Sequence, residues 1–111
     1  MGRFVKGDVV VLPFPYSDLT TSKKRPALVV APLSIHDDVL LCMSTSRSTK
    51  NTSAVAITAS DFVAGSLPHD SYVRPSRLFT ADSSIVLYKA GELSGDKVTA
   101  VVDEIIRIVS T

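Results

Sequence analysis

Three consecutive cations, Lys23, Lys24 and Arg25, stand where a polar stretch of the chain meets an apolar one. Positive side chains at the junction of a loop and a strand can bind phosphate, and arginine does so with a planar fork of donors. The same charges are also typical of a solvated basic loop end, and charge alone favours this second interpretation. The junction is a candidate phosphate site that needs support from a second segment.

A hydroxyl-rich cluster, Ser44-Thr45-Ser46-Arg47, supplies such a segment directly after the apolar run Val39–Met43. If the runs Pro26–Ala31 and Val39–Met43 pair as an antiparallel hairpin about Ile35, the start of the first faces the end of the second. This pairing predicts that Arg25 lies close to Ser44 and Thr45. The two polar segments would then form one site.

Metal and cofactor chemistry has little support. His36 and His69 lie in separate turns, each directly before an aspartate, and Cys42 has no other ligand nearby in the sequence. The chain has no Walker A loop, no G-x-G-x-x-G and no G-x-S-x-G motif. We therefore expect neither a metal nor a cofactor.

The composition is that of one folded domain covering residues 1–111. The chain is 45% hydrophobic and 21% charged, and a length of 111 residues is enough for a single core. The net charge of +1 excludes a strongly basic nucleic-acid protein. Residues 23–80 nevertheless carry seven basic against four acidic side chains, and residues 81–111 carry three against five. The middle of the chain is thus the part suited to a polyanion.

The single cysteine, Cys42, lies in an apolar run and is expected to be a buried free thiol, which favours a reducing compartment. No apolar stretch approaches the roughly 20 residues that span a bilayer, and the N-terminus lacks the pattern of a secretion signal. These features predict a cytoplasmic protein with no membrane partner.

The elements that must position the polar segments are mostly strands. Short apolar runs without alternation are typical of strands buried on both faces, as in a small closed barrel. Between the first two lies a polar, loop-like stretch, Tyr16–Lys24. Pro75 predicts an edge position or a bulge. The expected strands are Val9–Phe14, Pro26–Ala31, Val39–Met43, Ala54–Thr58, Ser71–Thr80 and a short sixth at Ile85–Tyr88.

The C-terminal segment has a different periodicity. From Ser94 onward, apolar residues recur at spacings of three and four, and Ser94 is placed as an N-cap with Asp96 in the first turn. This pattern predicts one amphipathic helix that packs against the barrel.

Two stretches resemble a known family. The first runs from Gly7 to Leu19 (GDVVVLPFPYSDL) and continues through Lys23–Val30 (KKRPALVV), and the second is Ser71–Asp82 (SYVRPSRLFTAD). Together with the terminal helix, they resemble the MazF/PemK/Kid toxins in the correct order along most of the chain. The resemblance implies a mainly β fold, an SH3-like barrel with a C-terminal helix.

The same resemblance implies a homodimeric endoribonuclease of a type II toxin–antitoxin system. Such an enzyme cleaves single-stranded RNA without a metal, by attack of the 2′-hydroxyl that leaves a cyclic phosphate and a 5′-hydroxyl. A cognate antitoxin would cover the RNA groove with an extended acidic tail. Operator DNA would be bound only through the antitoxin.

Arg25 falls on the family's catalytic arginine. Ser44 falls by count on its catalytic threonine, with Thr45 as the alternative hydroxyl. We expect Arg25 to stabilise charge on phosphate oxygens rather than to donate a proton, because a guanidinium keeps its proton to a pH above about 12. The sequence indicates no general base. The further residues expected to bind RNA are Lys23, Lys24, Ser46, Arg47, Arg74 and Arg77.

Two other functions compete with the ribonuclease. A non-catalytic SH3-like module would bind nucleic acid or peptide without cutting it, and the serine in place of threonine supports this interpretation. A gyrase poison of the related CcdB shape would act on DNA topology. The R-P-A-L-V-V element and the expected pairing of Arg25 with Ser44 favour the RNA enzyme.

Overall fold

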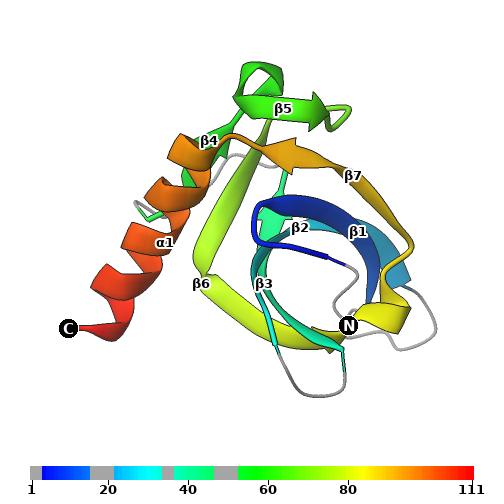
Figure 1. The fold of residues 1–111 in the computed structure, drawn as a ribbon, viewed down its shortest axis with the longest axis horizontal. Coiled ribbons are helices and arrows are strands. Elements are labelled where there is room, and N and C mark those ends of the chain that lie inside the picture. The colour runs from blue at the N-terminus through cyan, green and yellow to red at the C-terminus, as the bar shows by residue number, and fades with distance from the viewer. Residues whose placement is uncertain (1–3, 16–21, 34–36, 47–52) are drawn as a thin grey trace.

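The computed structural model describes residues 4–15, 22–33, 37–46 and 53–111. Within them a curled sheet forms a half-barrel, and one helix lies beside it (Figure 1). This confirms the predicted barrel and terminal helix. The elements are β1 (Asp8–Pro15), β2 (Ser22–Pro32), β3 (Asp38–Thr45), β4 (Val55–Ile57), β5 (Phe62–Gly65), β6 (Ser71–Asp82), β7 (Tyr88–Leu93), α1 (Gly95–Val109), and short 3₁₀ turns at Ala59–Asp61 and Ser83–Ile85.

The strands are antiparallel to their neighbours in the order β4-β6-β3-β2-β1-β7-β5. β2 and β3 form the predicted hairpin, in which Ala27 pairs with Met43 and Val29 with Leu41. β1 lies between β2 and β7, so the first and last strands of the chain are neighbours. Segments from both ends of the sequence therefore meet in one part of the sheet.

Apolar residues cover both faces of the curled sheet, which explains the uninterrupted apolar runs. Consecutive residues of a strand point to opposite faces, and Val9 and Val10 accordingly belong to different clusters. One cluster packs against α1 through Val98 and Val101. The other lies inside the curl and consists of Val10, Leu12, Ala27, Val29, Val39 and Leu41.

The helix α1 forms as predicted. The Ser94 hydroxyl accepts a hydrogen bond from the Lys97 amide at 3.4 Å, which satisfies one of the free donors of the first turn. Lys97 then donates through Nζ to the Ala56 carbonyl at 2.8 Å and ties the helix to β4. No helix among the described residues is long and apolar enough to cross a membrane.

Several element boundaries differ from the prediction. The expected strand at Ile85–Tyr88 is wrong, because Ser83–Ile85 is a 3₁₀ turn and β7 begins only at Tyr88. The Asp82 side chain accepts from the Ser84 amide at 2.9 Å, which favours a turn at that point. β5 was not predicted.

β2 also starts earlier than expected, since Ser22, Lys23 and Lys24 pair with β1 and are not part of a loop. Residues 16–21 of the expected loop lie outside the described residues. The irregularity predicted at Pro75 is confirmed: β3 and β6 pair at Cys42–Leu78 and next at Ser44–Val73, which leaves extra residues on the β6 side.

Candidate functional site

A cavity of about 400 Å³ opens at the end of the sheet where β1, β2 and β7 run together. Its volume falls in the range of roughly 300–1,000 Å³ that is typical of ligand sites. The described residues that line it are Val11 of β1; Lys24, Arg25 and Pro26 of β2; Ser46 after β3; Ser66, Leu67, Pro68, His69 and Ser71 around the β5–β6 connection; and Tyr88, Lys89 and Ala90 of β7.

The register of the sheet explains why these segments meet. Val11 pairs with Pro26 on one side and with Tyr88 on the other. Pro26 and Tyr88 are therefore two strand spacings apart, roughly 10 Å. Both line the cavity, together with Ser46, which directly follows β3, and Ser71, which begins the neighbouring strand β6.

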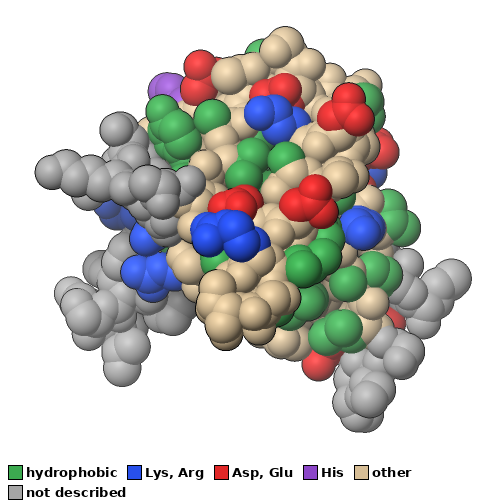
Figure 2. Space-filling model, turned by 90° about the vertical axis from the view of Figure 1, so that its left-hand side faces the viewer, with side chains coloured by type: hydrophobic (Ala, Val, Ile, Leu, Met, Phe, Trp, Pro, Cys, Tyr) green, Lys and Arg blue, Asp and Glu red, His purple; other side chains and the backbone are tan. Residues whose placement is uncertain are grey.

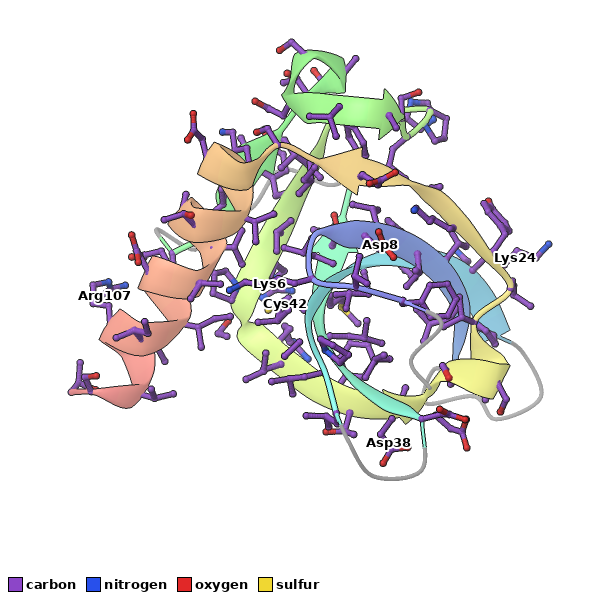
Figure 3. The ribbon with its side chains drawn as sticks, viewed as in Figure 1. Lys6, Asp8, Lys24, Asp38, Cys42 and Arg107 are labelled. Atoms are coloured by element: carbon purple, nitrogen blue, oxygen red, sulfur yellow. The ribbon has the colours of Figure 1, made fainter. Side chains whose placement is uncertain are left out.

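Two of the three cations of the predicted phosphate site, Lys24 and Arg25, line the cavity, and they lie on different faces of β2. Lys24 pairs with Pro13 and is exposed, and its side chain extends away from the sheet (Figure 3). Arg25 is half-buried and pairs with Leu12, a member of the cluster inside the curl. Arg25 thus lies on the face of β2 that carries this cluster, and it also lines the cavity.

The three hydroxyls after β3 lie at different depths. Ser46 is exposed and lines the cavity, Thr45 is half-buried opposite Tyr72, and Ser44 is 1% exposed opposite Val73. Because strand residues two apart share a face, Ser44 lies on the same face as Ser46, one step deeper. If the β2–β3 register continues past Ala27–Met43, it sets Pro26 across from Ser44 and Arg25 across from Thr45.

The Ser44 hydroxyl has no hydrogen-bond partner among the described residues, although it is fully buried. An unpaired buried polar group costs about 1–3 kcal/mol. Such groups in native proteins often have a role outside stability, including in catalysis. Ser44 does not line the cavity, but it shares a strand face with Ser46, which does, and this placement is compatible with that kind of role.

Three of the remaining residues expected to bind RNA, Lys23, Arg74 and Arg77, do not line the cavity. Lys23 and Arg77 are exposed outside it, and Arg47 lies outside the described residues. Arg74 is half-buried, and its Nε has no hydrogen-bond partner in the part of the chain that the structure describes. Alternation along β6 turns Arg74 away from the face of Ser71 and Val73, which is the face of the cavity.

Lys89 brings a third cation to the cavity, and sequence reasoning missed it. Its Nζ lies 3.3 Å from Asp8 Oδ1 and 3.3 Å from Glu92 Oε2. Asp8 is buried on β1, beside β7 (Figure 3), and its other oxygen accepts from the Val5 amide at 3.0 Å. The pKa of Lys89 is raised, mainly by its interaction with Glu92 and next by its interaction with Asp8. The side chain therefore keeps its positive charge.

The wall formed by Ser66, Leu67, Pro68 and His69 was also missed, because no strand was predicted at Phe62–Gly65. The signal for it is Gly65, which has φ +65° and ends β5 in a conformation that glycine adopts readily. The described parts of the chain hold no group of three His, Cys, Asp or Glu side chains that could bind a metal ion.

Comparison with known proteins gives one family. Residues 5–109 match the model of the PemK-like, MazF-like toxins of type II toxin–antitoxin systems. A search of curated proteins gives no match.

Solved structures share the fold. A MazE–MazF crystal structure from Deinococcus radiodurans has a TM-score of 0.77 at 20% identity and covers 97% of each chain. An endoribonuclease in complex with its cognate antitoxin, from a mycobacterial species, has a TM-score of 0.74 at 18% identity, over 99% of this chain and 96% of that one. The family match covers nearly the whole sequence, and the chain therefore belongs to the PemK-like, MazF-like toxins of type II toxin–antitoxin systems.

Proposed function

We propose that this toxin is an endoribonuclease that cleaves single-stranded RNA in the cavity beside Arg25, without a metal, through attack of the adjacent 2′-hydroxyl. The observation that carries the proposal is the convergence of Lys24, Arg25 and Lys89 with the Ser46 hydroxyl around one space of ligand size. A phosphodiester needs such a combination of fixed positive charge and hydrogen-bond donors.

Arg25 is assigned to the phosphate. Attack on phosphorus builds negative charge on the nonbridging oxygens, and a guanidinium already held in place stabilises that charge without having to reorganise. Arg25 is half-buried in a paired strand, so its backbone is fixed before RNA binds. Lys24 and Lys89 add positive charge around the same space, which raises affinity for the RNA backbone in a salt-dependent way.

Ser44 and Thr45 remain the two candidates for the catalytic hydroxyl. Ser44 is supported by its place on the same strand face as Ser46, which lines the cavity, and by its unpaired, buried oxygen. Thr45 is supported by the continuation of the hairpin register toward Arg25. Ser46, which lines the cavity, is assigned to RNA binding.

The partners follow from the family. We propose a cognate antitoxin that covers the cavity, a homodimer in solution, contact with operator DNA only through the antitoxin, and a cytoplasmic location. Similar solved structures include toxin–antitoxin complexes, which supports the first of these. Apolar side chains that remain exposed on α1, Ile106 at 54% and Val109 at 71%, support a protein contact on this face. Figure 2 shows this face, where hydrophobic side chains lie between acidic and basic ones.

The test is cleavage of mixed-sequence single-stranded RNA in EDTA by the wild type and by Arg25→Ala. We expect the wild type to cut, and Arg25→Ala to lose about a hundredfold to a thousandfold in rate, as is usual for one preorganised donor. Arg25→Lys keeps the charge but loses the planar fork and should also be badly impaired. Lys24→Ala should be mild and depend on salt.

The controls separate the competing functions. Circular dichroism and thermal unfolding of Arg25→Ala should match the wild type, because Arg25 is not part of either hydrophobic cluster. Cleavage by Arg25→Ala at the wild-type rate would refute the site. Wild-type protein that binds RNA without cutting it would make the non-catalytic module the better description.

A further inference from the structure

The cavity wall formed by Ser66, Leu67, Pro68 and His69 ends in a histidine. His69 is exposed and lines the cavity together with Arg25. Its main-chain carbonyl accepts a hydrogen bond from the Ser71 hydroxyl at 3.1 Å, and Ser71 is only 3% exposed. The backbone at His69 is therefore anchored to the sheet, while the imidazole is left at the cavity surface.

The other end of this wall is also held. Gly65 pairs with Gly91 of β7, and a Cβ added at Gly65 would lie 2.2 Å from the Ala90 carbonyl oxygen. Such a close approach leaves little room for the start of the wall to move relative to β7. Ala90 and Lys89 line the same cavity, so the wall that ends in His69 is held against the strand that carries Lys89.

Among the described lining residues, His69 is the one that carries an imidazole, the side chain most often used as a general base. The cations of lysine and arginine have no lone pair that could accept a proton, and the hydroxyls of serine and tyrosine are weak bases. Hydrogen bonds to two carboxylates strengthen this for Lys89 by raising its pKa. The lining groups excluded in this way are Lys24, Arg25, Lys89, Ser46, Ser66, Ser71 and Tyr88.

We propose that His69 is the general base of the reaction, an inference that rests on the proposed ribonuclease function. The neutral imidazole takes the proton of the 2′-hydroxyl as the 2′-oxygen forms its bond to phosphorus. The bond from phosphorus to the 5′-oxygen breaks, and the leaving oxygen takes a proton from water. The products are a 2′,3′-cyclic phosphate and a 5′-hydroxyl, and the imidazolium then returns its proton to solvent.

The experiment compares His69→Gln with Asp70→Asn, a change at the adjacent exposed residue that does not line the cavity. Loss of a general base lowers the rate about 10²- to 10⁴-fold. We expect that loss for His69→Gln, a wild-type rate for Asp70→Asn, and an unchanged unfolding temperature for both, since neither side chain is buried.

Chemical rescue distinguishes the base from a structural role. Added imidazole should restore cleavage by His69→Gly in proportion to the concentration of its free-base form, and should not restore Arg25→Ala. An RNA with sulfur in place of the leaving 5′-oxygen needs no proton on the leaving group. His69→Gln should remain as slow on this substrate, relative to the wild type, as on ordinary RNA.

The outcomes are separable. If the wild type fails to cut RNA, the proposed function is wrong. If the wild type cuts and Arg25→Ala does not, but His69→Gln cuts at the wild-type rate, only the assignment of His69 is wrong. Rescue that follows imidazolium, or recovery on the sulfur substrate, would overturn the role of His69 as a proton acceptor.

Discussion

Gly65→Ala tests the packing that holds the cavity wall. Gly65 has φ +65°, and its ideal Cβ would lie 2.2 Å from the Ala90 oxygen and 2.7 Å from the Gly91 Cα. Both contacts are with backbone, so no side chain can swing away to relieve them. The substitution must push β5 and β7 apart or change the turn that leads to His69.

The cost follows from two contributions. A residue with a Cβ in the left-handed region costs about 1–2 kcal/mol. Loss of a strand-end hydrogen bond when Gly65 and Gly91 separate adds roughly 1 kcal/mol. We expect the free energy of unfolding to fall by about 2–3 kcal/mol, which for a domain of this size lowers the unfolding temperature by roughly 8–12 °C. We expect the variant to remain folded, because the free energy of unfolding of such a domain is about 5–15 kcal/mol.

Gly95→Ala is the matched control. Gly95 begins α1, and a Cβ there would meet nothing within 4 Å. Alanine at a compatible position stabilises by about 0.4–1 kcal/mol, so the same chemical change should have the opposite sign. The assay is thermal unfolding followed by circular dichroism on both variants, together with RNA cleavage. An unfolding temperature for Gly65→Ala equal to that of the wild type would refute the close approach of β5 to β7.

Two further predictions concern the core and the assembly. Burial raises the pKa of the Cys42 thiol from 9.0 to about 12; the stability gained from the neutral buried thiol is therefore complete below pH 9 and lost as the pH rises toward 12. Denaturant unfolding at pH 8 and pH 10 should show a decrease for the wild type that is smaller for Cys42→Ala. The homodimer should appear in sedimentation velocity at micromolar concentrations, and a monomer at those concentrations would contradict it.

Periodicity predicted the parts of the fold in which one pattern dominates. The helix α1 was predicted with its N-cap, because the apolar residues recur at helical spacing and Ser94 stands directly before them. The β2–β3 hairpin was predicted because two apolar runs of strand length flank a short turn. Short strands were harder: β5 has no buried residue, and its place in the sheet comes from pairing with β7 rather than from an apolar signal.

Only the part of the candidate site that comes from segments adjacent in the sequence could be predicted. Arg25 and the hydroxyls after β3 flank one hairpin, so antiparallel pairing alone was enough to predict that they lie close together. Tyr88, Lys89 and His69 join them through contacts between distant parts of the chain. His69 in particular looked like an ordinary turn residue next to Asp70, and only the curl of the sheet shows which space its side chain borders.

The pairing of β1 with β7 makes the cavity dependent on the synthesis of β7. Val11 borders it from β1, whereas Tyr88, Lys89 and Ala90 arrive only with β7. During synthesis, β1, β2 and β3 leave the ribosome while the residues of β7 are still to be added. The nascent protein therefore has no assembled cavity until the residues of β7 have left the ribosome and paired with β1.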